Sequence, residues 1–281
     1  MDLQNKTTVI TGGASGIGLA TAYKFASLGA NLVLGDIEEG PLQEAVSRLR
    51  DTGAKVIGVT GDVSKEDDVL ALRDAALDEF GGAHVIFNNA GVGAGPTIGT
   101  PKKVWDWVMS VNVDGVVNGI NAFMPIFLEQ NEGHVVNTGS LAGLGGVPGM
   151  GAYCASKFAV VGISESLYHE LAMRESAVGV SALCPGFVKT RIHESTRNMP
   201  SGLRSYAESP EAQLLGDMSA SVVKAGIEPE VVADAIADAI INKKFWILTH
   251  ERAALRTTEQ RLEWMRGAGP TRINLDGATK P

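Results

Sequence analysis

The chain has 281 residues, of which 44% are hydrophobic and 20% are charged, and its formal net charge is −8. These proportions are ordinary for a globular protein that buries a large core, so they exclude disorder over most of the chain. The Lys and Arg residues form no basic stripe that could neutralise phosphates along a nucleic acid. We therefore expect no nucleic-acid partner.

Cys154 and Cys184 are the only cysteines, which is too few for a disulfide scaffold and fits a reducing, cytoplasmic location. A strand-like run begins at Thr7 with no charged and apolar leader before it. The longest apolar stretch, residues 116–128, is interrupted by Asn and Pro and is shorter than the roughly 20 residues of a membrane span. The sequence thus predicts a soluble protein without a membrane segment.

Short apolar runs alternate with helix-length segments, such as 66–80 and 153–175, up to about residue 250. Near-continuous apolar strands between periodic helices indicate a parallel sheet that is covered on both faces. The predicted fold is α/β, a doubly wound and mainly parallel sheet of seven strands. These strands are expected at residues 7–11, 31–36, 55–60, 84–87, 134–138, 178–183 and 245–248.

We expect residues 1–250 to form a single domain, because α/β sheets of this size commonly do. Residues 192–226 interrupt the alternation before a helix that begins near Pro229, and so long a connection usually carries function, here as a substrate lid. Residues 251–266 are expected to be helical. Residues 267–281 form a tail whose low apolar content is typical of a disordered end.

Gly12, Gly16 and Gly18 lie where the first strand is expected to turn into the first helix. Glycines at this place let the backbone approach a pyrophosphate, and the start of the helix offers unpaired N–H groups. A glycine-rich turn can also be purely structural. The glycines alone therefore leave both interpretations open.

Asp36 closes the second predicted strand, 18 residues after Gly18, close to the offset of about 20 that is typical of an acid bound to the adenosine ribose. Its carboxylate would repel a 2′-phosphate, and no Arg or Lys occupies Ser15 or Ile37 to offset that repulsion. An isolated Asp at a strand end can instead cap a turn. Together with the glycines, Asp36 favours NAD as the cofactor over NADP.

Tyr153 and Lys157 are four residues apart, so on a helix the phenol and the ammonium lie on the same face. A neighbouring cation favours a phenolate, which predicts that Lys157 lowers the pKa of Tyr153 and makes it a usable general acid and base. Ser140 precedes the pair by 13 residues. Each residue alone can have a purely structural role, as a packed aromatic, a solvated charge or a strand-end hydroxyl. Only their joint occurrence favours a catalytic role.

Over roughly residues 5–250, these motifs in their order resemble those of the short-chain dehydrogenase/reductase family. The resemblance implies a Rossmann-type fold, hydride transfer with NAD, and a homo-oligomer, a tetramer or a dimer, with the helices after Pro101 and Tyr153 at one interface. The matching motifs are Thr11-Gly-x-x-x-Gly16-Ile-Gly18, Asn88-Asn89-Ala90-Gly91, Asn112, Ser140, Tyr153-x-x-x-Lys157 and Pro185-Gly186.

The resemblance implies a catalytic group of Asn112, Ser140, Tyr153 and Lys157. Ser140 would donate a hydrogen bond to the substrate oxygen, and Tyr153 would exchange its proton. Lys157 would act on Tyr153 and hold the hydroxyls of the nicotinamide ribose. Asn112 would position a water that relays protons to Lys157.

The resemblance also implies the residues that hold the cofactor. Asp62 and Val63 would flank the adenine, and Val188 and Thr190 would hold the carboxamide of the nicotinamide. The full expected set is Gly12, Ser15, Gly16, Ile17, Gly18, Asp36, Asp62, Val63, Asn89, Ala90, Gly91, Tyr153, Lys157, Pro185, Gly186, Val188 and Thr190.

The leading hypothesis is an NAD-dependent dehydrogenase that interconverts a secondary alcohol and its ketone. Residues 92–98 and 141–150 should border the nicotinamide and contain no charged residue, which favours an uncharged, apolar substrate. The lid should add apolar side chains to this wall. Those considered are Met199, Leu203, Tyr206, Leu214, Leu215 and Met218.

Two other functions stay open. One is an NADPH-dependent reductase of carrier-bound ketoacyl groups, against which Asp36 argues. The other is a catalytically silent, NAD-binding interaction protein, although the expected loss of Tyr153 or Lys157 is not seen. Ser140 lacks the Gly-x-Ser-x-Gly elbow of a serine hydrolase, and the five histidines lack metal-ligand spacing, so neither a hydrolase nor a metal site is expected.

Overall fold

The computed structural model describes residues 1–93 and 95–269, apart from the side chains of residues 207, 211 and 215. Seven strands form one sheet in the order β3-β2-β1-β4-β5-β6-β7, and every neighbouring pair is parallel. The predicted doubly wound α/β fold is confirmed, with a sheet that is parallel throughout. The strands are β1 Thr7–Thr11, β2 Asn31–Asp36, β3 Val56–Thr60, β4 Val85–Asn88, β5 His134–Thr138, β6 Gly179–Leu183 and β7 Trp246–Ile247.

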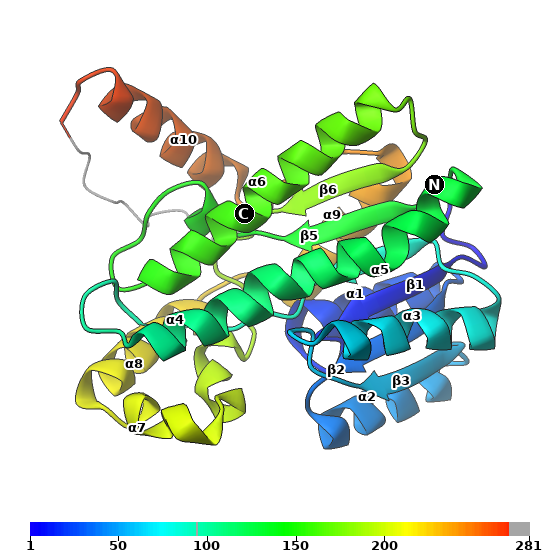
Figure 1. Cartoon of the computed structure of the whole chain (residues 1–281), viewed down its shortest axis with the longest axis horizontal. Coiled ribbons are helices and arrows are strands. Elements are labelled where there is room, and N and C mark those ends of the chain that lie inside the picture. The colour runs from blue at the N-terminus through cyan, green and yellow to red at the C-terminus, as the bar shows by residue number, and fades with distance from the viewer. Residues whose placement is uncertain (94, 270–281) are drawn as a thin grey trace.

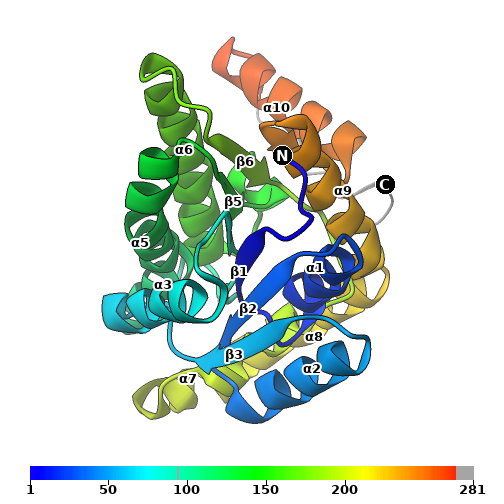
Figure 2. The ribbon, with the colours of Figure 1, turned by 90° about the vertical axis from the view of Figure 1, so that its right-hand side faces the viewer.

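Helices cover both faces of this sheet. Figure 1 shows the helices that lie in front of the strands, and Figure 2 shows both layers from the side. One layer contains α3 Glu66–Phe80, α5 Gly115–Gln130 and α6 Gly151–Met173. The other contains α1 Gly16–Ser27, α2 Glu39–Asp51 and α9 Pro229–Asn242.

Successive residues of the central strand β1 pack into different layers. Val9 belongs to the cluster that contains Phe123 of α5, whereas Ile10 belongs to the cluster that contains Phe25 of α1. All four of these strand and helix residues are buried. Burial on both faces explains why the strand sequences are almost continuously apolar instead of alternating.

The order of the strands places a switch point between β1 and β4. From β1, the chain adds β2 and β3 on one side and then β4 to β7 on the other. In open α/β sheets, ligands bind in the crevice outside the carboxyl ends of the strands at such a point. Here β1 ends at Thr11, just before the glycine-rich turn, and β4 ends at Asn88, just before Asn89.

Residues 102–130 form one continuous helix, made of α4 Lys102–Met109, a π-helical turn Ser110–Asp114 and α5. The helix runs through Pro125, at which the sequence alone suggested an interruption. By length and composition it could cross a membrane, but core helices of soluble proteins meet the same criterion. Here it packs against α3 and α6 as part of a helical layer.

The lid, residues 192–226, leaves the sheet after β6. It contains two 3₁₀ turns, Ile192–Asn198 and Ser201–Leu203, followed by helices α7 Arg204–Ala207 and α8 Pro210–Lys224. Its base is closed by backbone hydrogen bonds, because Lys189 N donates to Ile227 O at 2.9 Å and Ile227 N donates to Phe187 O at 3.0 Å. The interruption predicted from the sequence is therefore an excursion that starts and ends at one place.

The carboxyl-terminal part begins with a short edge strand. β7 has two residues instead of the predicted four, because only Trp246 and Ile247 pair with β6. The predicted helix follows as α10 Glu251–Met265, which projects from the body in Figure 1. Most of the predicted tail, from residue 270 onward, lies outside the described residues.

Candidate active site

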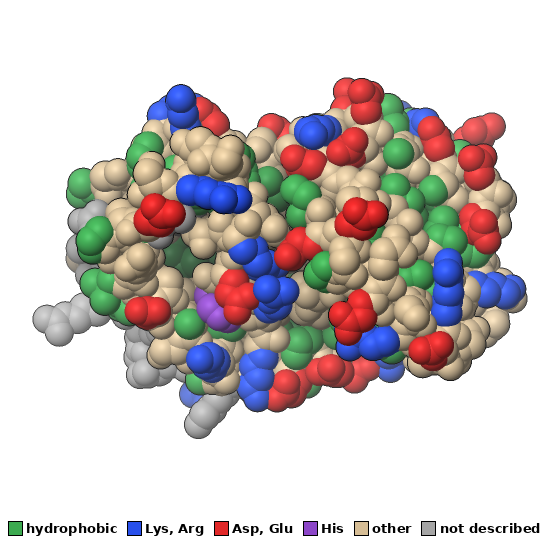
Figure 3. Space-filling view, turned by 90° about the horizontal axis from the view of Figure 1, so that it is seen from below, with side chains coloured by type: hydrophobic (Ala, Val, Ile, Leu, Met, Phe, Trp, Pro, Cys, Tyr) green, Lys and Arg blue, Asp and Glu red, His purple; other side chains and the backbone are tan. Residues whose placement is uncertain are grey.

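A cavity of about 770 Å³ opens at the carboxyl ends of the strands, within the range that is typical of small-molecule and cofactor sites. Its lining includes both Asp36 at the end of β2 and Tyr153 on α6. Figure 3 shows this face of the molecule hollowed, with basic and acidic side chains gathered beside the hollow. The cavity is lined by every predicted cofactor residue except Gly18, and by Ser140.

The glycine-rich turn shapes the cavity floor. Gly12 and Gly16 have φ angles of +64° and +52°, which side chains rarely adopt. Gly18 lies behind the floor, where a Cβ atom would come within 2.2 Å of the carbonyl oxygen of Gly12. Gly18 therefore acts by letting α1 approach the turn closely. The start of α1 lines the cavity through Gly16 and Ile17, and the start of a helix suits a phosphate.

Asn89 joins the ends of β1 and β4 beside this turn. Its Nδ2 donates to Thr11 O at 3.0 Å and to Gly12 O at 3.2 Å. Thr11 Oγ1 in turn accepts from the backbone N–H groups of Asn89 and Ala90, at 2.9 and 3.1 Å. These bonds fix the two loops that flank the switch point, so Asn89 and Ala90 line a preformed wall.

Asp36 lies at the opposite wall with both carboxylate oxygens engaged. Oδ2 accepts from Ala14 N and Oδ1 accepts from Glu38 N, each at 3.0 Å. Burial raises the pKa of this carboxyl group, and the backbone hydrogen bonds oppose that effect. A partly buried carboxylate of this kind gains from further donors such as ribose hydroxyls. The turn-capping and cofactor-binding interpretations of Asp36 are thus compatible.

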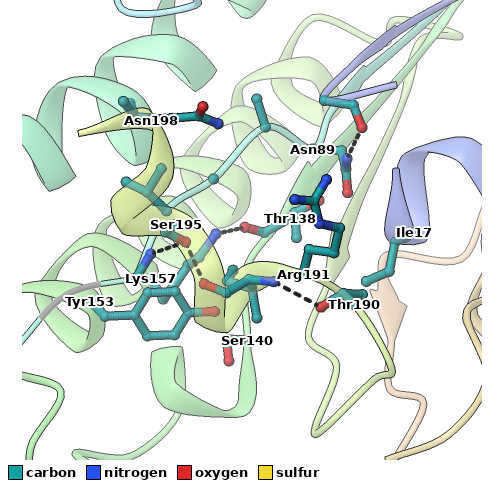
Figure 4. Close-up of a pocket in the computed structure, with 18 of the residues that line it drawn as sticks. Ile17, Asn89, Thr138, Ser140, Tyr153, Lys157, Thr190, Arg191, Ser195 and Asn198 are labelled. Carbon is teal, nitrogen blue, oxygen red and sulfur yellow. Dashed lines mark hydrogen bonds between the residues drawn. The ribbon is translucent and has the colours of Figure 1, made fainter. Parts of the chain in front are cut away.

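Ser140, Tyr153 and Lys157 gather at the other end of the cavity, as Figure 4 shows. The Ser140 hydroxyl accepts from Ala142 N at 3.1 Å. Lys157 Nζ lies 5.5 Å from the centre of the Tyr153 ring and donates to Thr138 O at 2.7 Å. The three side chains predicted to carry the chemistry are thus brought together, with a hydroxyl and a phenol facing the same space.

The pKa of Tyr153 differs from the expectation drawn from its spacing to Lys157. Burial raises the pKa of Tyr153 to about 12, and the Ser140 hydroxyl opposes this only in part. Burial also lowers the pKa of Lys157 to about 8. Within this chain, desolvation therefore has a larger effect on the pKa of Tyr153 than the attraction between phenolate and ammonium, which we expected to dominate.

Asn112 lies in the π-helical turn and is fully buried beneath the wall, outside the cavity lining. Its Oδ1 accepts from Val92 N at 2.8 Å, and its Nδ2 donates to Val92 O and to Ser156 Oγ, both at 2.9 Å. The side chain thus joins the loop after β4 to α6. π-Helical turns are frequent at functional sites, and this one aims the amide at the loop. The predicted water relay through Asn112 stays a prediction.

The lid is fastened across the substrate end of the cavity. Gly93 N donates to Ser195 Oγ at 3.1 Å, and the hydroxyls of Thr100 and Tyr206 are 3.1 Å apart. Ser195 from the lid and Lys157 from α6 both line the cavity (Figure 4). The lid therefore forms one wall of the site.

The apolar residues of the lid divide into two groups. Leu203 lines the cavity and Met199 is buried beside it, with Tyr206 packed against the same cluster. In contrast, Leu214 and Met218 are 62% and 60% exposed, so the expectation that they face the substrate is wrong. They lie on α8, whose outer face is turned to solvent. The predicted side chain of Leu215 lies outside the described residues.

The remaining wall of the cavity carries both apolar and polar side chains. From α4 and the π-helical turn, Trp107 and Val111 line the cavity, and neither was considered from the sequence. Five charged residues that line the cavity were missed: Glu38, Lys103, Asp106, Arg191 and Arg197. Motif spacing gave no signal for them, because they meet only through the fold. Among the described residues, no group of His, Cys, Asp or Glu side chains is placed to hold a metal ion.

Comparison with known proteins identifies the family to which the chain is similar. A family model described as short chain dehydrogenase matches residues 6–201. A relative from Lactiplantibacillus plantarum, named CLA biosynthesis dehydrogenase/reductase, is 34% identical over 256 residues, covering 89% of both chains. The 3beta-hydroxysteroid dehydrogenase 2 of Eggerthella lenta is 36% identical over 227 residues, covering 78% of this chain and 86% of that protein.

A solved structure gives the same result. A short-chain dehydrogenase/reductase from Burkholderia phymatum in complex with NAD superposes with a TM-score of 0.93 at 43% identity, covering 98% of this chain and 99% of that chain. The matched part of the chain carries the glycine-rich turn, Ser140, Tyr153 and Lys157. The chain therefore belongs to the short-chain dehydrogenase/reductase family of NAD(P)-binding oxidoreductases.

Proposed function

We propose that this protein uses NAD(H) to interconvert an uncharged secondary alcohol and its ketone. The observation that carries the proposal is one cavity that contains Asp36 at one end and Ser140 with Tyr153 at the other. The residues fit a dinucleotide, because glycines with positive φ line the floor and a partly buried carboxylate lies where ribose hydroxyls would bind. The structure neighbour from Burkholderia phymatum, in complex with NAD, supports this choice of cofactor.

In this proposal, each side chain at the reaction end has one task. The Ser140 hydroxyl accepts from Ala142 N, so it can donate its own proton to the substrate oxygen. Tyr153 gives its proton to that oxygen during reduction and takes it back during oxidation. Lys157 holds ribose hydroxyls and favours the phenolate. The cofactor, when bound, supplies or accepts the hydride.

Asn112 is a positioning residue in this proposal. Through its bonds to Val92 and Ser156 it sets the distance between the loop after β4 and α6. Gly91 lies on this loop, and a Cβ atom there would be 3.4 Å from Asn112 Oδ1 and 3.5 Å from Lys157 Nζ. The Asn112 amide therefore supports the part of the loop, at Gly91, that lies close to Lys157 Nζ.

We propose an apolar substrate because Val92, Trp107 and Leu203 belong to the wall near the reaction end. Burying an anionic group against such side chains costs desolvation free energy. The relative named 3beta-hydroxysteroid dehydrogenase points to substrates of the same kind, with a hydroxyl on an apolar body. We also propose that the enzyme acts as a homo-oligomer, as many members of its family do.

Cofactor titration followed by a substrate series tests the proposal. NADH should bind at least about tenfold more tightly than NADPH, a difference of about 1.4 kcal/mol. Neutral secondary alcohols should then be oxidised with NAD in preference to hydroxy acids of matched size. Equal binding of both cofactors would contradict the NAD assignment, and preference for hydroxy acids would contradict the substrate class. Binding without turnover on any alcohol would favour a silent, NAD-binding protein.

A further inference from the structure

An ion pair joins the loop after β2 to the first turn of the lid. Arg197 Nε and Nη2 donate to Glu38 Oε2 at 3.0 and 2.8 Å. Arg197 Nη1 also donates to the carbonyl oxygen of Arg191 at 3.2 Å. The Glu38 and Arg197 side chains are only 23% and 26% exposed. The guanidinium is therefore committed to partners within the chain.

This pair lies at the adenosine end of the cavity. Glu38 follows Asp36 by two residues, and its backbone N–H donates to the Asp36 carboxylate at 3.0 Å. Asp36, Glu38 and Arg197 all line the cavity. A cation is thus paired with the residue two positions after the carboxylate that we propose to bind the ribose, although the sequence places none at Ser15 or Ile37.

A guanidinium at this end would ordinarily favour a phosphorylated cofactor. Arginine binds phosphate groups through charge-assisted and often bidentate hydrogen bonds. Here the Glu38 carboxylate already accepts hydrogen bonds that Arg197 could otherwise donate to a phosphate. The hydrogen bond from Arg197 is the main cause that lowers the pKa of Glu38. The second arginine, Arg191, is paired as well, because its Nε donates to Glu194 Oε2 at 2.7 Å. Both cations are thus balanced by carboxylates.

We propose that Glu38 is a second cofactor-selecting residue, which holds Arg197 in an ion pair and so withholds it from a phosphate monoester on the adenosine ribose. Asp36 repels such a phosphate directly, whereas Glu38 acts by occupying the cation that could bind it. The inference rests on the proposed NAD preference and adds a second determinant to it.

Direct titration of NADH and NADPH with Glu38→Gln tests the inference without relying on turnover. Loss of the carboxylate charge frees Arg197, so NADPH should bind about tenfold more tightly than to the wild type, while NADH binding changes little. The new affinity should fall as salt is added, because an ion pair with phosphate is screened. No gain in NADPH affinity would overturn the inference.

The double variant Glu38→Gln/Arg197→Gln identifies the source of the gain. If Arg197 supplies it, the NADPH affinity returns to the wild-type level. If the gain persists, Glu38 acts only through its own negative charge, and the inference is wrong. It is also wrong if Glu38→Gln and Arg197→Gln weaken both cofactors equally, because the pair would then only fasten the lid.

Glu228→Gln is the matched control. Glu228 pairs with Lys189 near the base of the lid, and neither residue lines the cavity. The same change of charge should leave NADPH binding unaltered, and thermal unfolding should show that every variant is folded. Equal binding of NADH and NADPH to the wild type would contradict the proposed function alone, since the comparison of single and double variants still decides the role of Glu38.

Discussion

Tyr153 carries the most direct prediction at the scale of single residues. Tyr153→Phe retains the ring and removes the exchangeable proton, so turnover should fall by roughly 10² or more, the scale of general acid/base catalysis, while NADH still binds. Steady-state kinetics and NADH titration measure the two effects.

Tyr168→Phe is a suitable control for this variant. Tyr168 lies on the same helix, α6, and is 44% exposed, away from the cavity lining. Its substitution should leave turnover unchanged. Near-normal turnover of Tyr153→Phe would remove the phenol from the proposed role.

Gly18 tests the close packing of the glycine-rich turn. Because an added Cβ would lie 2.2 Å from Gly12 O, Gly18→Ala must displace the start of α1. We expect a loss of about 1–3 kcal/mol in the free energy of unfolding, as for other overpacked sites, and NADH binding weakened by at least about tenfold. Urea unfolding and NADH titration check both effects.

Gly162→Ala provides the comparison. Gly162 lies inside α6, where an added Cβ meets nothing within 4 Å among the described residues. This variant should gain roughly 0.5–1 kcal/mol, because alanine is favoured over glycine inside a helix. If both variants behave alike, close packing is not the function of Gly18.

At the scale of elements, His134 connects β5 and β6 and makes this connection sensitive to acid. The ring is 1% exposed, and its Nε2 lies 2.8 Å from Ser181 Oγ. Burial lowers its pKa from 6.5 to about 3. Between these pH values the unfolded chain binds a proton that the native chain does not. Its contribution to stability is therefore present above pH 6.5 and is lost as the pH falls, at up to about 1.4 kcal/mol per pH unit.

His134→Gln should remove this part of the acid sensitivity. As the pH is lowered from 7 to 4, the free energy of unfolding should fall less steeply in the variant than in the wild type. The difference in slope should be about 1.4 kcal/mol per pH unit, the contribution of one proton. His169→Gln, at an exposed position of α6, should keep the wild-type slope. Identical slopes in all three proteins would show that His134 is not the responsible group.

At the scale of the whole molecule, the lid and the sheet together form the substrate wall. Leu203 lines the cavity, so Leu203→Ala should raise the KM of bulky neutral alcohols by roughly tenfold, about 1.4 kcal/mol of lost apolar contact. Leu214→Ala, at a residue 62% exposed on the same lid, should leave the ranking of substrates unchanged. Kinetics on a series of alcohols of increasing size measure both effects. An unchanged ranking in Leu203→Ala would show that the lid does not contact the substrate.

The resemblance to a known family placed the expected cofactor residues, all of which line the cavity except Gly18. The sequence by itself determined the fold class and the positions of the seven strands. These features depend on local patterns: apolar runs of strand length, helical periodicity, and glycines at the end of β1. The spacing of Tyr153 and Lys157 likewise placed them on one helix, α6. The ends of the strands were predicted less accurately. In β7, for example, pairing with β6 decides where the strand begins and ends.

Only the tertiary structure decided the features that depend on distant partners or on burial. Glu38 and Arg197 are 159 residues apart and meet because the lid crosses the end of β2. The pKa of Tyr153 depends on desolvation, which spacing to Lys157 does not report. The amide of Asn112 turns toward Val92 because the helix contains a π-turn. Likewise, packing of α8 against the 3₁₀ turn Ile192–Asn198 leaves Leu214 facing solvent. Local sequence sets which elements form, whereas contacts between elements set the direction and charge state of each side chain.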